Sequence, residues 1–170
     1  LVHGTMANAM PQALGLKKAY PERQVISISG DGGLAMLLGD LLTAIQEKLP
    51  IKVVVLNNAS LNFVELEQKV EGLLDNYTDL LNPDFARLAE VIGFHGRKVT
   101  RSEELETAVQ KFLAQPGPAL LDVHTNPAEL VMPPKIEFGQ VADTALYAAK
   151  AVLSGRFKDV ETLLVNNLLK

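Results

Sequence analysis

The spacing of apolar residues differs from one segment of this chain to the next, and this spacing distinguishes predicted strands from predicted helices. Short runs that alternate or stay apolar predict four strands, at residues 24–29, 51–56, 95–100 and 119–125. Apolar residues at three- and four-residue steps predict three helices, at 34–49, 83–92 and 102–115. Strands and helices in alternation favour an α/β fold, a three-layer, doubly wound parallel sheet with helices on both faces.

Turn and capping residues refine this picture. Pro50 ends one helix, and Ser102 is a suitable N-cap for the helix that follows it. The run 51–56 is the most apolar strand, so we expect it at the centre of the sheet, covered on both faces. The polar stretch 72–83 is long for a connection, which favours a loop with a functional role.

Both ends of the chain predict helices. Residues 5–19 form an Ala- and Met-rich segment, in which Pro11 is tolerated only within the first helical turn. The last segment predicts two helices that separate near Ser154-Gly155. We therefore expect a main domain at 1–135 and a C-terminal helical tail at 136–170.

Composition narrows the class of protein. The chain has 170 residues, of which 48% are apolar, so it is one domain's worth of chain with a substantial core. A net charge of −4 without basic clusters argues against nucleic-acid binding, and the absence of cysteine is compatible with a reducing cytoplasm. Leu1-Val2-His3 is neither an initiator nor a targeting segment, which suggests that the chain begins inside a larger protein.

The stretch Gly30-Asp31-Gly32-Gly33 joins a predicted strand to a predicted helix that begins near Leu34. Its glycines allow backbone N–H groups to approach a ligand closely, and a helix start favours anions, so the stretch predicts a phosphate site. The carboxylate of Asp31 would repel a phosphate unless a cation lay between them. The stretch itself therefore favours a divalent metal ion.

The next strand ends in Asn57-Asn58, and adjacent parallel strands open onto the same edge of a sheet. Asp31, Asn58 and a loop carbonyl would leave room around an octahedral Mg²⁺ for two phosphate oxygens and a water. A diphosphate therefore fits this pattern better than a single phosphate.

Two other interpretations remain open. Gly30-x-Gly32-x-x-Ala35 also matches a relaxed dinucleotide-binding fingerprint, but the next strand ends in asparagines instead of the acidic residue that a ribose requires. A tight turn without any ligand would explain the glycines, but it leaves Asp31 and Asn57-Asn58 unexplained.

Gly30-Asp31-Gly32, 24 further residues and then Asn57-Asn58 resemble the thiamine diphosphate signature of 2-oxo acid decarboxylases, oxidases and synthases. Residues 3–11 and 58–67 resemble the branch of bacterial pyruvate oxidases and quinone-dependent pyruvate dehydrogenases. The resemblance covers essentially the whole chain, as the domain that binds the cofactor's diphosphate.

The resemblance implies roles for individual residues. The carbonyl of Gly4 would accept a hydrogen bond from the aminopyrimidine, and Met6 would support the bent cofactor. The carbonyl of Ser60 would complete the metal ligands Asp31 and Asn58. The expected cofactor-binding residues are Gly4, Met6, Gly30, Asp31, Gly32, Gly33, Asn58 and Asn62.

The segment after Asn58 carries the expected reaction-centre residues. Phe63 and Glu67 match positions that line the reaction centre, with a core aromatic and a solvated helix residue as the alternative. Asn62 stands where the family usually has glycine, and because Asn tolerates a left-handed conformation we expect the turn to persist. His3 is a weaker candidate, whereas His95 and His124 are expected to be surface residues of strands without a catalytic role.

The resemblance also implies an activity for the larger protein. A pyruvate oxidoreductase would decarboxylate pyruvate on thiamine diphosphate and Mg²⁺, then pass electrons through FAD to a quinone or oxygen, giving acetate or acetyl phosphate. The N-terminal pyrimidine-binding domain and the FAD domain are not in this sequence, so we expect the isolated chain to be inactive. The alternatives are an acetolactate synthase or 2-oxo acid decarboxylase domain, and a non-catalytic interaction module.

The resemblance further implies partners and a location. The family typically forms homo-tetramers, and a C-terminal segment of the quinone-dependent enzymes binds the membrane surface. Phe157, Val160, Leu163, Leu164 and Leu168 give the last helix an apolar face. That face would either attach a cytoplasmic protein to the inner surface of the cell membrane or pack on the protein itself.

Overall fold

The computed structural model describes residues 4–128 and 138–167. The chain forms two compact units, a sheet unit of residues 1–59 and 81–125 and a helical unit of residues 60–80 and 126–170. The expected boundary at residue 135 falls outside the described residues, as does His3.

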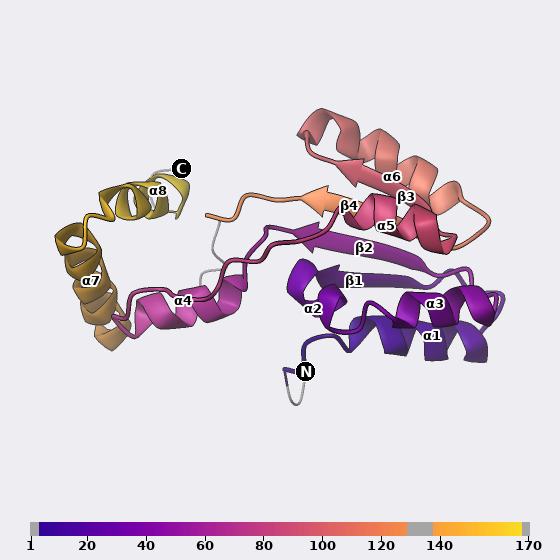
Figure 1. The fold of residues 1–170 in the computed structure, drawn as a ribbon, viewed down its shortest axis with the longest axis horizontal. Coiled ribbons are helices and arrows are strands. Elements are labelled where there is room, and N and C mark those ends of the chain that lie inside the picture. The colour runs from indigo at the N-terminus through magenta and orange to yellow at the C-terminus, as the bar shows by residue number, and fades with distance from the viewer. Residues whose placement is uncertain (1–3, 129–137, 168–170) are drawn as a thin grey trace. The chain divides into compact units, whose positions relative to one another are not determined.

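The sheet unit is built on four parallel strands. They are β1 (Ile26–Gly30), β2 (Lys52–Asn57), β3 (His95–Val99) and β4 (Ala119–His124), in the spatial order β1-β2-β4-β3 (Figure 1). All four correspond to predicted strands, and β2 has neighbours on both sides, as its apolar sequence predicts. Because β4 lies directly beside β2, the carboxyl ends of these two strands meet.

Helices cover both faces of this sheet, which confirms the predicted α/β class. Contacts place α1 (Ala9–Ala19), α3 (Asp40–Gln46) and α5 (Phe85–Ile92) around one core, which contains Met10, Leu41, Val53, Phe85 and Leu120. The other face carries α6 (Leu105–Ala114), whose Phe112 packs with Leu121 and Val99. Gly96 of β3 allows α5 to approach the sheet, since a Cβ there would lie 2.1 Å from the carbonyl oxygen of Ala86.

The prediction of a single helix at 34–49 is wrong. The chain forms α2 (Asp31–Met36), a turn at 37–39 and then α3, so Gly32 and Gly33 belong to a helix instead of the loop before it. Leu34 and Leu41 are buried, whereas Leu42 stays 57% exposed. The leucine spacing continues across the break, and periodicity therefore cannot reveal it.

Other boundaries differ less. Pro11 lies in the first turn of α1 as predicted, but α1 begins at Ala9 instead of Thr5. Ser102 does not cap a helix, because it is the first residue of the 3₁₀ turn η1 (Ser102–Glu104) that precedes α6. Asp84 caps α5 through a hydrogen bond from the Arg87 N–H, a capping role that the sequence analysis missed.

The helical unit contains α4 (Asn62–Val70), α7 (Phe138–Leu153) and α8 (Phe157–Asn167). α7 and α8 separate at Gly155, which has a φ of 78°, close to the predicted break. On α8, Phe157 and Leu164 are exposed and Leu163 is half-buried. Leu168 lies outside the described residues, and within them no helix has the length and apolarity needed to cross a membrane.

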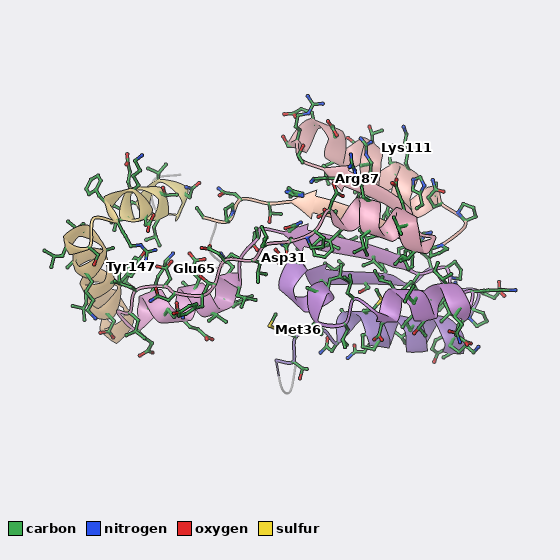
Figure 2. The ribbon with its side chains drawn as sticks, viewed as in Figure 1. Asp31, Met36, Glu65, Arg87, Lys111 and Tyr147 are labelled. Carbon is green, nitrogen blue, oxygen red and sulfur yellow. The ribbon has the colours of Figure 1, made fainter. Side chains whose placement is uncertain are left out.

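Ion pairs hold the helical unit together. Arg156 donates to Asp75 at 2.9 Å and to Asp159 at 2.6 Å, which connects α8 to the loop after α4. Lys69 and Glu65 form a second, largely buried pair on α4. Tyr147 of α7 is fully buried, and burial together with the nearby Asp75 carboxylate raises the pKa of its hydroxyl (Figure 2).

Candidate active site

The candidate site lies in the sheet unit, where β1 passes into α2. Asp31 is the first residue of α2 and only 2% exposed (Figure 2). A Cβ added to Gly33 would meet Ser29 Oγ at 2.9 Å and the backbone nitrogen of Ala7 at 3.5 Å, so the segment that follows Met6 runs beside this turn. A Cβ at Gly30 would meet no atom within 4 Å, which leaves open space on that side of the turn.

The carboxylate of Asp31 is held by hydrogen bonds from three groups. Its Oδ1 accepts one bond, from the Gly32 N–H at 2.9 Å. Its Oδ2 accepts two bonds of 2.7 Å, from the Ala59 N–H and from Nδ2 of Asn82. The two oxygens are therefore unequal, and Oδ1 keeps more acceptor capacity than Oδ2.

One of these donors, Ala59, is a left-handed residue in the turn after β2. Ala59 has a φ of 56°, which costs a residue with a Cβ about 1 kcal/mol. The N–H of Ala59 donates to Asp31, directly after the half-buried Asn58. Strain of this kind tends to persist where the surrounding structure requires it.

A chain of amide hydrogen bonds extends from Asp31 across the sheet. Nδ2 of Asn82 also donates to Oδ1 of Asn57 at 3.0 Å, and Nδ2 of Asn57 donates to Oδ1 of Asp122 at 3.0 Å. Asn57 and Asp122 are 4% and 0% exposed. Oδ2 of Asp122 lies 3.5 Å from Nε2 of His124 and has no hydrogen bond among the described residues.

This part of the sheet unit lacks strong positive charge. Within residues 4–128 and 138–167, no lysine or arginine pairs with Asp31 or Asp122. No cluster of three His, Cys, Asp or Glu side chains suited to a metal occurs in that part of the chain either. A cation at Asp31 would therefore need amide and carbonyl oxygens as its remaining protein ligands, which are the donors that the sequence proposed.

The predicted site residues divide between the two units. Gly4, Met6, Gly30, Asp31, Gly32, Gly33 and Asn58 belong to the sheet unit, whereas Ser60, Asn62, Phe63 and Glu67 belong to the helical unit. Met6 is 43% exposed beside the turn. Phe63 and Glu67 are exposed one helical turn apart on α4, so Phe63 is not a core aromatic.

Two details near α4 differ from expectation or add to it. Asn62 is the first residue of α4 and is not a left-handed residue. The left-handed residue of this turn is Ala59, three positions earlier. The side chain of Asn62 instead donates to the Pro127 carbonyl at 2.9 Å. Ser60 is buried, and its Oγ donates to Glu65 at 2.8 Å, which orders the residue without using its carbonyl.

Asn82 and Asp122 were missed by the sequence analysis. Asp122 stands out in retrospect as the one carboxylate of the apolar strand 119–123. Asn82 precedes Pro83, which favours an extended backbone there, but its contact with Asp31 depends on the tertiary fold. His95 is exposed on β3 and His124 ends β4, in agreement with the surface positions predicted for both.

A parallel sheet with an Asp-bearing glycine turn and an Asn-Asn strand end at one edge is the arrangement of a thiamine diphosphate-binding domain. The family model for the C-terminal TPP binding domain of thiamine pyrophosphate enzymes matches residues 1–123. The chain therefore belongs to the thiamine pyrophosphate enzymes.

The chain is similar in sequence to several thiamine pyrophosphate proteins. The chain is 42% identical to YdaP of Bacillus subtilis over 86% of its length, and 37% identical to the mitochondrial acetolactate synthase catalytic subunit of Saccharomyces cerevisiae over 76%. It spans only 25% and 19% of these two relatives. Among solved structures, the thiamine diphosphate-dependent 4-hydroxybenzoylformate decarboxylase of Rhodococcus jostii RHA1 superposes with a TM-score of 0.66 and 33% identity, over 71% of this chain and 23% of the decarboxylase.

Proposed function

We propose that this domain anchors thiamine diphosphate through Mg²⁺, with Asp31, Asn58 and the carbonyl of Ser60 as protein ligands. The observation that carries this proposal is the buried Asp31 carboxylate, which has no cationic partner among the described residues and keeps acceptor capacity on Oδ1. A buried carboxylate without a cation is costly, and a bound metal ion removes that cost. The role of Ser60 rests on its place in the sequence, two residues after Asn58.

The donor set fits the group. Carboxylate, amide and carbonyl oxygens are hard ligands that suit Mg²⁺, and Mg²⁺ commonly binds through one or two such groups plus phosphate oxygens. The start of α2 has backbone N–H groups that lack an acceptor within the helix. The Gly32 N–H donates to Asp31 Oδ1, so within Gly32-Gly33 the Gly33 N–H is the donor proposed for the diphosphate. The open space beside Gly30 gives a ligand room to approach that backbone.

When bound, thiamine diphosphate supplies the electron sink for decarboxylation of a 2-oxo acid, and the protein supplies binding and orientation. Asp31 and Asn58 would fix the position of the cofactor through the cation. Met6, in the segment beside the turn, would support the cofactor, and the Gly4 carbonyl would accept a hydrogen bond from the aminopyrimidine of the cofactor. The proposed role of Phe63 and Glu67 at the reaction centre rests on the resemblance of residues 58–67.

Two reactions are candidates for the full-length protein, pyruvate oxidation and acetolactate synthesis. The resemblance of residues 3–11 and 58–67 favours pyruvate oxidation with FAD and a quinone. Several relatives are named acetolactate synthases, which favours the carboligating alternative without deciding it. Analysis of the products that the full-length protein forms from pyruvate separates the two, because one yields acetolactate and the other acetate or acetyl phosphate.

Calorimetric titration of the chain with thiamine diphosphate, in Mg²⁺ and in EDTA, tests the anchor. We expect binding that requires Mg²⁺ and that Asp31→Asn weakens at least about 10-fold, since the variant removes the only charged ligand. Asp40→Asn is the matched control, because Asp40 is the first residue of α3 as Asp31 is of α2. Equal binding in Mg²⁺ and EDTA would contradict the proposal.

A further inference from the structure

The amide of Asn82 has its orientation fixed by the groups around it. A carboxylate only accepts hydrogen bonds when ionised, so the side of Asn82 that faces Asp31 must be its NH₂ group. The second hydrogen of that NH₂ group goes to Asn57 Oδ1. Rotation of the Asn82 amide by half a turn would place its oxygen against two acceptors.

Asp122 fixes the other end of this series of amide hydrogen bonds. Because Asn57 accepts from Asn82 through its oxygen, its NH₂ group points to Asp122, which is fully buried and accepts at 3.0 Å. The result is a directional row of amides between two buried carboxylates. Such a row is satisfied in one arrangement only, and it therefore holds Asn82 in place.

The row makes the two oxygens of Asp31 unequal. Oδ2 accepts two short bonds, from Asn82 and from the Ala59 N–H, whereas Oδ1 accepts one bond from the described residues, that of the Gly32 N–H. A metal ion that bound both oxygens would have to displace donors from Oδ2. A metal ion that bound Oδ1 alone would leave the row intact.

We propose that Asn82, supported by Asn57 and Asp122, is a positioning residue that restricts Asp31 to binding the cation through one oxygen and thereby favours Mg²⁺ over Ca²⁺. The inference rests on the proposed function, since it takes Asp31 as a metal ligand. Mg²⁺ requires a small octahedral site with single oxygen contacts, whereas Ca²⁺ is larger and readily binds both oxygens of a carboxylate. Partners behind a metal ligand commonly tune metal binding in this way.

The test measures thiamine diphosphate binding in Mg²⁺ and, separately, in Ca²⁺, for the chain and for Asn82→Ala. We expect the variant to lose about 10-fold to 100-fold in Mg²⁺-supported affinity. The Ca²⁺-supported affinity should fall much less, so the ratio of the two affinities moves toward Ca²⁺. A loss of fold alone would lower both affinities by the same factor.

Matched variants accompany this measurement. Asn76→Ala removes an exposed asparagine whose side chain donates to the Leu74 carbonyl and whose backbone bonds to Gln68, and it should leave the ratio unchanged. Asp122→Asn keeps an acceptor for Asn57 and should also preserve the ratio, whereas Asp122→Leu should shift it as Asn82→Ala does. If Asp122→Leu does not fold, Asn82→Ala decides the matter alone.

The outcomes separate the two proposals. An unchanged Mg²⁺-to-Ca²⁺ ratio in Asn82→Ala, with Asp31→Asn still weakening the Mg²⁺-dependent binding, would overturn the inference and leave the proposed function standing. Binding of thiamine diphosphate that needs no cation in the unmodified chain would overturn both. A shifted ratio confined to Asn82→Ala and Asp122→Leu supports the positioning role.

Discussion

The two units surround a carboxylate that is shielded from solvent with different partners. In the helical unit, Asp75 is paired with Arg156, so the positive charge comes from the chain itself. In the sheet unit, Asp31 accepts only uncharged donors, including Asn82. Asp75 thus has a charged partner, whereas the residues that the structure describes give Asp31 none.

A bound cation is expected to stabilise the sheet unit more than the helical unit. A carboxylate that is matched by arginine gains little from a metal ion, because the ion would compete with the guanidinium. A carboxylate that is held by amides is oriented without being neutralised, and it remains available to a cation. The contrast leads to predictions in which each unit responds to a different perturbation.

The largest expected effect on stability comes from Arg156→Ala in the helical unit. The variant leaves Asp75 without its ion pair, and because Arg156 is about one-third exposed we expect a loss of about 2–3 kcal/mol in the free energy of unfolding. Urea denaturation measures this loss. Arg87→Ala, an exposed arginine on α5, is the control and should change stability by less than about 0.5 kcal/mol (Figure 2).

A smaller effect is expected from acid. Burial alone would raise the pKa of Asp75, but the hydrogen bond from Arg156 and the charge of Lys69 outweigh it, so the pKa lies below the usual 3.8. Since the folded-state pKa is depressed, this contribution to stability is present above the usual pKa and is lost as pH falls through the folded value.

Urea denaturation of the chain and of Asp75→Asn, from neutral pH to about pH 2.5, tests this expectation. Asp75→Asn removes the titrating group, so the variant should lose less stability than the chain below about pH 4. Identical slopes for the two proteins in that range would contradict the role given to Asp75.

The smallest expected effect on stability belongs to Gly30→Ala. Gly30 has a φ of −70° and a ψ of 160°, which alanine adopts freely, and its Cβ would meet no atom within 4 Å. We expect thermal unfolding within about 0.5 kcal/mol of the unmodified chain. Thiamine diphosphate affinity should nonetheless fall, because the added methyl group occupies space beside the ligand's backbone seat.

Gly96→Ala is a contrasting control for this prediction. Its Cβ would lie 2.1 Å from the Ala86 carbonyl oxygen, so it should destabilise the sheet unit whether or not a ligand is present. A strongly destabilised Gly30→Ala would show that the glycine serves the fold instead of the ligand.

Much of the fold follows from sequence because its determinants are local. β1 and β2 end at Gly30 and Asn57, one residue beyond their predicted ends, and α5 begins two residues after its predicted start. These positions are predictable because apolar runs there are bounded by glycine, asparagine or proline. The break at 37–39 could not be predicted in this way. Leu37 and Leu38 continue the helical spacing across it, and only packing against the sheet distinguishes the two helices.

The candidate site was only partly predictable for a different reason. Asp31 and Asn58 stand out in a motif, but the contact of Asp122 with Asn57 exists only because β4, and not β3, is the neighbour of β2. The contact of Asn82 with Asp31 joins residues that lie 51 positions apart in the sequence. That strand order is a tertiary property, because the chain must skip a position to produce it. The direction of the amide row then follows from the two carboxylates at its ends.

The position of Asn82 directly before Pro83 has a consequence for chemical ageing. Asparagine usually converts to aspartate when the backbone nitrogen of the next residue attacks the side-chain amide and expels ammonia through a cyclic imide. Proline has no N–H and its ring nitrogen is fully substituted, so this route is closed at Asn82. Asn82, which as an aspartate would place a second negative charge against Asp31, is thereby protected from deamidation by this route. Asn57 is followed by Asn58 and depends on burial for the same protection.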